Sequence, residues 1–198
     1  MLVARGLHRL HVGPVELQAE AGTCTSIEGR SGSGKSVLLR MFADLDPHAG
    51  DCELDGRACS AMPAPAWRRL VTYVPAEAGW WFDRVGPHFR HPDEAAALLP
   101  RVGIPGEALE WPVARLSTGE RQRLALLRAL TPANRVLLLD EPTSGLDDES
   151  RDQVEQVLRE RLSRGTTIVL VTHDPEFARR LASRQYEMRD GQLQARRA

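Results

Sequence analysis

Lysine is almost missing from this sequence. Of its 26 basic side chains, one is Lys35 and the other 25 are arginine. A general preference for arginine accounts for the 25 but not for the one exception. A compact ammonium on a thin stem differs from a planar guanidinium in shape and in hydrogen bonding. We therefore interpret Lys35 as a residue whose task an arginine cannot perform.

Several other features are scarce as well. The three cysteines, Cys24, Cys52 and Cys59, are odd in number and lack metal-ligand spacing, so we expect reduced thiols, as in the cytosol. No apolar run approaches the roughly 18 residues that span a bilayer. The opening segment, MLVARGLHRLHVG, lacks the unbroken apolar stretch of a signal peptide. A net charge of −1 gives no electrostatic reason to expect nucleic-acid binding.

Strand-like and helix-like segments alternate along the chain, which indicates an α/β core. Short apolar and β-branched runs predict strands at 22–28, 51–60, 70–75, 135–140 and 166–172. Apolar residues at helical spacing predict helices at 36–45, 118–130, 149–164 and 175–182. Residues 83–112 are rich in proline and glycine around a short helical patch, and they predict a small separate lobe. Asp190-Gly191 predicts a turn within a terminal hairpin.

The segment GRSGSGKS, residues 29–36, matches the pattern G-x-x-x-x-G-K-[ST] at every fixed position. Its glycines allow the backbone N–H groups to surround an oxyanion, and the following helix directs its positive dipole end to the same place. Lys35 would reach the β- and γ-phosphates, and the Ser36 hydroxyl would bind Mg²⁺. An incidental lysine in a glycine-rich turn is the alternative, which the flanking strand and helix disfavour. The predicted nucleotide-binding residues are Gly29, Arg30, Ser31, Gly32, Ser33, Gly34, Lys35, Ser36 and Val37.

Two carboxylates end the apolar strand RVLLLDE. Asp140 is a candidate Mg²⁺ ligand, and Glu141 is a candidate general base that polarises an attacking water. His173 follows the next buried strand, where open α/β sheets bind their ligands, and is a candidate phosphate sensor. The alternatives are an acidic strand end capped by a turn and a structural histidine.

Four motifs together resemble one family. LSTGERQRLALLRAL is similar to the signature motif and helix of the ATP-binding cassette (ABC) ATPases, DEPTSGLD to their Walker B motif and D-loop, and VTHD to their switch histidine. With the phosphate loop they stand in the family's order, and the resemblance covers essentially the whole chain. It implies a single α/β domain over residues 1–198, a P-loop NTPase cassette of the ABC type. Its parts would be a mainly parallel core sheet, an N-terminal antiparallel β-subdomain and a small helical subdomain at about 78–130.

The resemblance also implies a mechanism. Two cassettes would pack head to tail around two molecules of ATP with Mg²⁺. Ser117, Gly119 and Glu120 would contact the ATP held by the partner subunit, and the dipole of the helix that follows would assist them. Asp147 would couple the two sites. The catalytic residues would be Lys35, Glu141 and His173.

Some positions depart from the family pattern. The Q-loop glutamine is replaced by Ala76, so we expect hydrolysis to survive at a lower rate unless Glu77 substitutes for it. At signature positions three and five, Thr118 and Glu120 replace glycine and glutamine, and we expect little effect from either change. The family stacks an aromatic residue on adenine. His11 is the candidate here, and an exposed histidine without that role is the alternative.

The aromatic run Trp80, Trp81 and Phe82 has two interpretations: it fills the core, or it lines a groove for a membrane subunit. The resemblance favours an ATP-binding and ATP-hydrolysing transporter subunit. It would form a dimer, preferably a homodimer, and reach the inner face of the cytoplasmic membrane through a permease, without inserting itself. A soluble ABC ATPase without a transport role and a weakly hydrolysing regulatory subunit remain alternatives.

Overall fold

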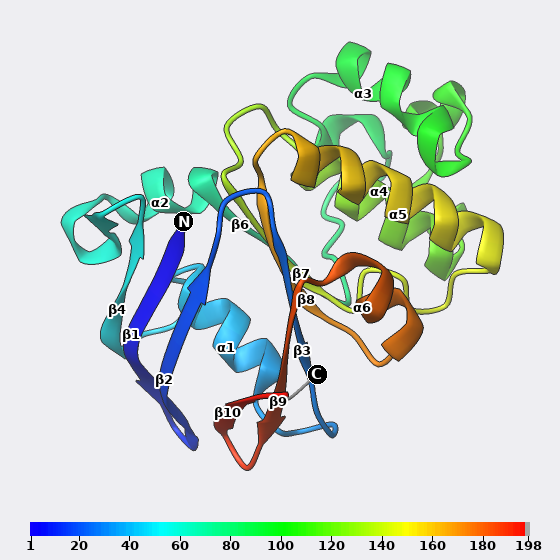
Figure 1. Ribbon diagram of the computed structural model, residues 1–198. Helices are drawn as coiled ribbons and strands as arrows, with labels where there is room; N and C mark the ends of the chain where they lie inside the picture. The colour runs from blue at the N-terminus through cyan, green and yellow to red at the C-terminus, as the bar shows by residue number, and fades with distance from the viewer. Residues whose placement is uncertain (197–198) are drawn as a thin grey trace.

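The larger of two sheets forms the centre of the molecule (Figure 1). In the computed structural model, which describes residues 1–196, this sheet has six strands in the order β10-β9-β3-β8-β7-β6. Neighbouring strands are parallel, except that β10 pairs antiparallel with β9. The mainly parallel core sheet predicted from the sequence is therefore present. Its strands are β3 Cys24–Glu28, β6 Val71–Val74, β7 Val136–Asp140, β8 Thr167–Val171, β9 Arg184–Arg189 and β10 Gln192–Ala195.

The smaller sheet is antiparallel and has the order β2-β1-β4-β5 within the described residues. It matches the expected N-terminal β-subdomain. The sequence alone located only its second half. Register shifts between Ala4 and Arg9 interrupt the alternation of buried and exposed residues in the first strand, whereas the second strand alternates regularly from Val15 and was missed nonetheless. The strands are β1 Leu2–Arg9, β2 Val12–Ala19, β4 Ala49–Leu54 and β5 Arg57–Ala58.

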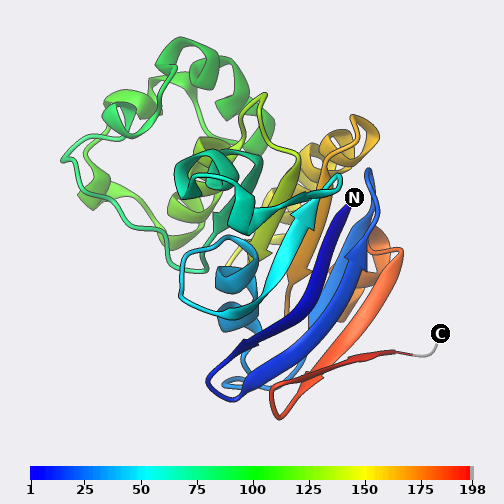
Figure 2. The same ribbon diagram turned by 90° about the vertical axis from the view of Figure 1, so that its left-hand side faces the viewer.

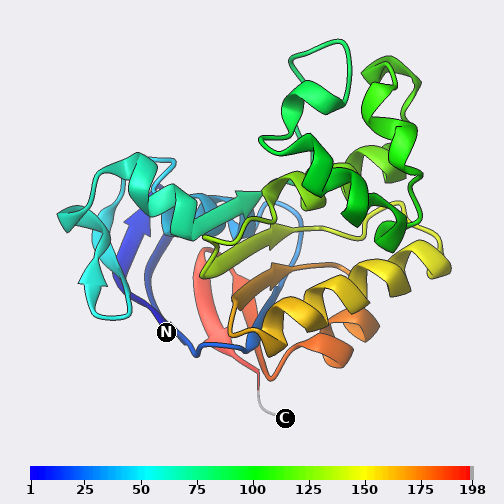
Figure 3. The ribbon, with the colours of Figure 1, turned by 90° about the horizontal axis from the view of Figure 1, so that it is seen from above.

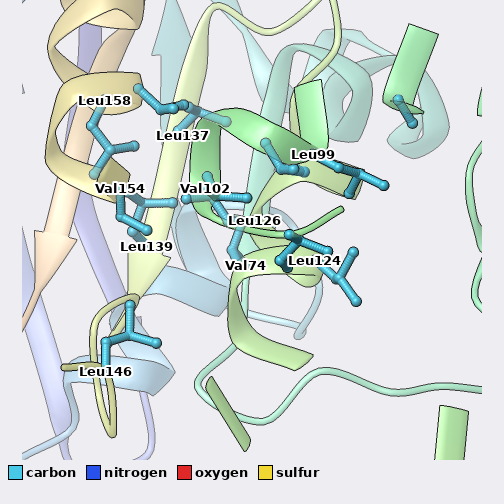
Figure 4. Packing of buried hydrophobic residues seen from close by; sticks show 14 of the residues in the cluster. Val74, Leu99, Val102, Leu124, Leu126, Leu137, Leu139, Leu146, Val154 and Leu158 are labelled. Carbon is cyan, nitrogen blue, oxygen red and sulfur yellow. The ribbon is translucent and has the colours of Figure 1, made fainter. Parts of the chain in front are cut away.

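Alternate residues of β7 support two separate hydrophobic clusters. Leu137 and Leu139 face one cluster with α4 and α5 (Figure 4), whereas Val136 and Leu138 face the other with α1 and the antiparallel sheet. Because both faces are covered, the four residues of the strand before Asp140 are all apolar. The helices over the two faces are α1 Lys35–Phe42, α4 Thr118–Ala129, α5 Asp148–Ser163 and α6 Pro175–Leu181.

The segment between β6 and α4 projects from the body as a small lobe (Figures 2 and 3). It contains one α-helix, α3 Pro92–Leu98, and short 3-10 turns at Gly86–His88, Leu99–Val102, Gly106–Glu110 and Val113–Arg115. Leu99 and Val102 join the cluster of Leu124 and Leu126 from α4, so α4 connects the lobe to the core sheet.

One helix was not anticipated from the sequence. α2, Ala64–Leu70, is a short helix after Pro63, and it is anchored by Trp67, whose Nε1 donates to the Phe42 carbonyl at 2.9 Å. This contact joins α2 to the end of α1 over 25 residues of sequence. None of the helices within residues 1–196 has the length and hydropathy needed to cross a bilayer.

Candidate active site

The loop between β3 and α1 curls tightly because glycine occupies its two most crowded positions. Gly29 has φ of 149°, and a Cβ there would lie 2.3 Å from the Met188 carbonyl oxygen. Gly34 has φ of 104°, and a Cβ there would lie 2.3 Å from Val12 Cγ2. Any side chain at these positions would push the loop away from β2 and β9. The curl therefore depends on glycine, as the phosphate-loop pattern predicts.

Lys35 lies inside this curl and is only 7% exposed. Its Nζ donates to the Gly29 carbonyl at 2.6 Å and to the Arg30 carbonyl at 3.0 Å. Burial lowers the pKa of Lys35, and the nearby negative charges of Glu141 and Asp140 oppose that change. A guanidinium is too broad to place its centre of charge between two carbonyls of such a narrow loop. This geometry agrees with the interpretation of the single lysine.

Asp140 ends β7 on the same face of the sheet as α1. It is 4% exposed, and its Oδ2 accepts a hydrogen bond from the Tyr73 hydroxyl at 3.0 Å. Burial and the negative charge of Asp140 raise the pKa of Tyr73, so the phenol keeps its proton and remains a donor. The aspartate is thus fixed before any ligand binds.

Glu141 turns away from the strand with φ of 51°, and its backbone N–H donates to the Val171 carbonyl at 2.8 Å. Its Oε2 accepts from the backbone N–H of His173 at 3.1 Å, and its Oε1 lies 3.3 Å from His173 Nε2. Burial raises the pKa of Glu141, while the hydrogen bond from His173 opposes the shift. A carboxylate with a raised pKa suits a general base.

A cavity of about 390 Å³ brings all three predicted catalytic residues together. The ammonium, hydroxyl, carboxylates and imidazole that line it are the groups that would bind a triphosphate and a hard divalent cation. An adjoining cavity of about 590 Å³ shares His11, Ser31 and Gly32 with it and is also lined by Arg30 and Ser33. The first cavity is lined by His11, Ser31, Gly32, Gly34, Lys35, Ser36, Val37, Ala76, Asp140, Glu141 and His173.

The signature and D-loop residues lie outside both cavities in this chain. Ser117 is the N-cap of α4 and forms a capping box with Glu120. A Cβ added at Gly119 would lie 3.1 Å from Leu146 Cδ2, so α4 begins close against the D-loop. Asp147 caps α5 by accepting from the Ser150 N–H at 2.8 Å, which lowers the pKa of its carboxyl. These residues therefore belong to a second surface of the molecule.

Comparison with known proteins identifies the family. The model of the ABC transporter family matches residues 12–144, which include the phosphate loop, the signature and the two carboxylates. This chain belongs to the ABC transporter family. The family resemblance of the sequence is thereby confirmed.

Two relatives and one solved structure illustrate the relationship. The chain is 44% identical over 180 residues to the Fe(3+) ions import ATP-binding protein FbpC of Streptomyces coelicolor, covering 83% of this chain and 51% of that protein. It is 36% identical over 200 residues to the macrolide export ATP-binding/permease protein MacB of Bordetella avium, covering 90% and 30%. A post-hydrolysis dimer of the ATP-binding cassette MJ0796 bound to ADP and Pi superposes with a TM-score of 0.80 at 22% identity, with full coverage of both chains. The cassette fold is therefore confirmed, while the chain spans about half or less of these two relatives.

His11 lies against the phosphate loop of the cassette. A Cβ added at Gly34 would be 3.5 Å from His11 Nε2, and the His11 ring borders both cavities. The tip of the β9–β10 hairpin holds the β1–β2 turn in place, because the Gly13 N–H donates to the Gly191 carbonyl at 2.8 Å. The stacking of His11 on adenine stays a prediction, which the place of His11 beside the phosphate loop supports.

Two residues of the candidate site were not predicted from the sequence. Tyr73 was assigned only to a strand, and its contact with Asp140 spans 67 residues. Gln122 was part of the helix after the signature. It is buried, and its Nε2 donates to the Glu141 carbonyl at 3.2 Å. Strand alternation places Tyr73 on the same face as Asp140 and could have suggested the first contact, but no sequence signal indicates the second.

Tyr73→Phe should loosen Asp140 without changing the packing of the ring. We expect the free energy of unfolding to fall by about 1.5–3 kcal/mol, the range for a hydrogen bond to a charged group, and the Mg²⁺ concentration at half-saturation to rise. Urea denaturation and a Mg²⁺ titration of nucleotide binding measure the two effects. Tyr186→Phe, in β9, is the matched control. Equal changes in both variants would show that the Asp140 contact has no specific role.

Proposed function

We propose that this chain is the ATP-binding and ATP-hydrolysing subunit of an ABC transporter, folded as one ABC ATPase domain over residues 1–198. One observation carries the proposal. A single cavity gathers Lys35, Asp140, Glu141 and His173, whereas the signature serine, Ser117, lies on a different surface of the same chain. A site divided in this way is complete only when a second cassette supplies its signature. The dimeric MJ0796 cassette has the same fold.

The chemistry follows from the groups in the cavity. Lys35 and the N–H groups of the loop would hold the phosphates, and Ser36 and Asp140 would hold Mg²⁺. Bound Mg²⁺ would supply positive charge to the phosphoryl group. Glu141 would take a proton from the attacking water, because its carboxylate faces the cavity and has a raised pKa. His173, 3.3 Å from Glu141, would orient that carboxylate.

Glu141→Gln tests this proposal directly. We expect turnover to fall by at least about 100-fold, because general-base catalysis contributes roughly that factor or more. ATP and Mg²⁺ should then trap the variant as a dimer on a sizing column. Glu176→Gln, in the first turn of α6, removes the same charge elsewhere and should leave turnover unchanged. Undiminished hydrolysis by Glu141→Gln would refute the assigned base.

Alanine at the Q-loop position, Ala76, favours a low rate of ATP hydrolysis. Ala76 lines the cavity beside Lys35 and the two carboxylates, but a methyl group can neither bind a metal nor orient water. Glu77 is exposed and is not among the residues that line the cavity. This arrangement supports reduced hydrolysis, and the weakly hydrolysing regulatory subunit is the second candidate function.

Ala76→Gln should raise the steady-state turnover severalfold, because it returns a polar side chain to the cavity. Glu77→Gln is the companion variant. If Glu77 substitutes for the missing glutamine, Glu77→Gln will lower turnover, and if it does not, turnover will stay constant. Unchanged rates for Ala76→Gln, both alone and with membranes, would mean that the departure at position 76 is tolerated.

The partner in the membrane would be a permease subunit. Trp80 packs against the core cluster, whereas Trp81 and Phe82 are 66% and 47% exposed. The core-filling interpretation therefore holds for Trp80 and fails for the other two. Trp81 and Phe82 pack edge-on against His88, with ring centroids 4.8 and 5.0 Å from its ring, and the Arg128 guanidinium lies 4.9 Å from the Trp81 centroid, so they form a preorganised aromatic surface beside one positive charge. Such a surface next to the Q-loop suits an apolar helix of a membrane subunit.

Trp81→Ala should weaken attachment to membranes without changing hydrolysis by the purified chain. The measurement is the fraction of tagged chain that sediments with membranes of its own cells. Leu45→Ala, which also removes a partly exposed apolar side chain, is the control and should sediment as the wild type does. Equal sedimentation of the Trp81 variant would place the membrane contact elsewhere.

The relatives are named for import and for export, so their names leave the direction of transport open.

A further inference from the structure

We infer that Glu120 restrains closure of the proposed ATP dimer. Its carboxylate accepts hydrogen bonds from the signature serine, Ser117, and adds negative charge where the partner's nucleotide would bind. The inference rests on the proposed function and concerns its regulation. The sequence suggested that glutamate in place of glutamine at this position has little effect. The contacts of Glu120 indicate a specific role.

Glu120 and Ser117 use each other's hydrogen-bonding groups. The backbone N–H and the Oγ of Ser117 both donate to Glu120 Oε2 at 2.8 Å. The Glu120 N–H donates in return to Ser117 Oγ at 3.2 Å. A serine hydroxyl has a single proton, so Ser117 cannot donate to Glu120 and to a phosphate oxygen at the same time. A docking phosphate must therefore compete with a carboxylate for that proton.

The carboxylate is ionised under ordinary conditions. The hydrogen bonds from Ser117 lower the pKa of Glu120, and the charges of Arg123 and Arg115 lower it further. These arginines are themselves close enough to offset part of the negative charge. The carboxylate nevertheless lies at the end of α4 where the helix dipole favours an anion, so it already occupies the place that a phosphate would take.

The helix that follows the phosphate loop provides an internal comparison. α1 has no acidic residue in its first turn and no side-chain cap, so its first N–H groups remain available to phosphate. α4 has both an acidic residue and a complete capping box. Of these two helix N-termini, only that of α4 must lose hydrogen bonds of its side-chain cap before it can bind the phosphate of the partner's nucleotide.

Glutamine would keep the cap and remove the charge. Its amide oxygen can accept from the Ser117 N–H, as in the S-x-x-Q form of the capping box, but it is a weaker acceptor for the hydroxyl proton. Glu120→Gln therefore separates the electrostatic effect from helix stability. Because a symmetric dimer would contain the contact twice and bind two ATP molecules, the effect on the ATP midpoint is that of one contact for each ATP.

The test compares Glu120→Gln with the unchanged residue in a Glu141→Gln background, which prevents hydrolysis. The measured quantity is the ATP concentration at half-maximal dimerisation with Mg²⁺, by light scattering. We expect a roughly three- to tenfold decrease for Glu120→Gln, the scale of one screened charge contact. The difference should narrow in high salt, because exposed charges are screened. Glu94→Gln, in the first turn of α3, is the charge-matched control and should not shift the midpoint.

Two further measurements make each outcome decisive. Binding of a fluorescent ATP analogue to dilute monomer should be equal in all variants. Glu120→Ala, which removes the charge and the cap, should also lower the midpoint if it folds. Equal midpoints for Glu120→Gln and the background would overturn this inference and leave the proposed function intact. Tight nucleotide binding with no dimer in either chain would overturn both the dimer and this inference.

Discussion

The ammonium of Lys35 inside the curled loop is the contact on which the site depends. Two loop carbonyls hold Nζ, and the curl that brings them close requires glycine at positions 29 and 34. The same crowding presses the loop against Val12 of β2 and Met188 of β9, so both sheets define its shape. A larger cation or a side chain at either glycine would disturb the cavity and the junction between the sheets. This constraint explains why an arginine-rich chain keeps one lysine.

The alternation of side chains along β7 determines which residues face the hydrophobic clusters and which face the site. Residues 137 and 139 bury against the helices that connect to the lobe, while residues 136, 138 and 140 face α1. Asp140 therefore reaches the face of the phosphate loop because its strand is regular, and Glu141 leaves that regularity with a positive φ. Its carbonyl then accepts from Gln122, which ties the end of β7 to the helix that carries the signature. Glu141, the proposed general base, and the helix of the signature are thus joined by one partly buried hydrogen bond.

The features that could be predicted from the sequence are those that depend on local sequence pattern. The strands and helices of the core have strong periods, and the candidate catalytic residues lie in short motifs. β1 was not located because register shifts break its period, whereas β2 was missed although Val15, Leu17 and Ala19 alternate with exposed residues. Tyr73 and Gln122 were missed because their partners lie 67 and 19 residues away, and only the pairing of strands and the packing of α4 bring them together. The capping box of Ser117 and Glu120 has a sequence signature, S-x-x-E, that could have indicated the contact before the structure did.

The helix ends give the clearest physical distinction between the two halves of the proposed site. α4, α5 and α6 begin with side-chain caps from Ser117, Asp147 and Asp174, whereas α1 begins at Gly34 without one. An uncapped end leaves N–H donors unsatisfied unless an anion binds them, so α1 gains most from a phosphate. A capped end is already satisfied, and binding there must replace an existing bond. In the proposed dimer, the phosphate loop would therefore bind nucleotide at once, while the signature would bind it only after rearrangement, so nucleotide binding would precede closure.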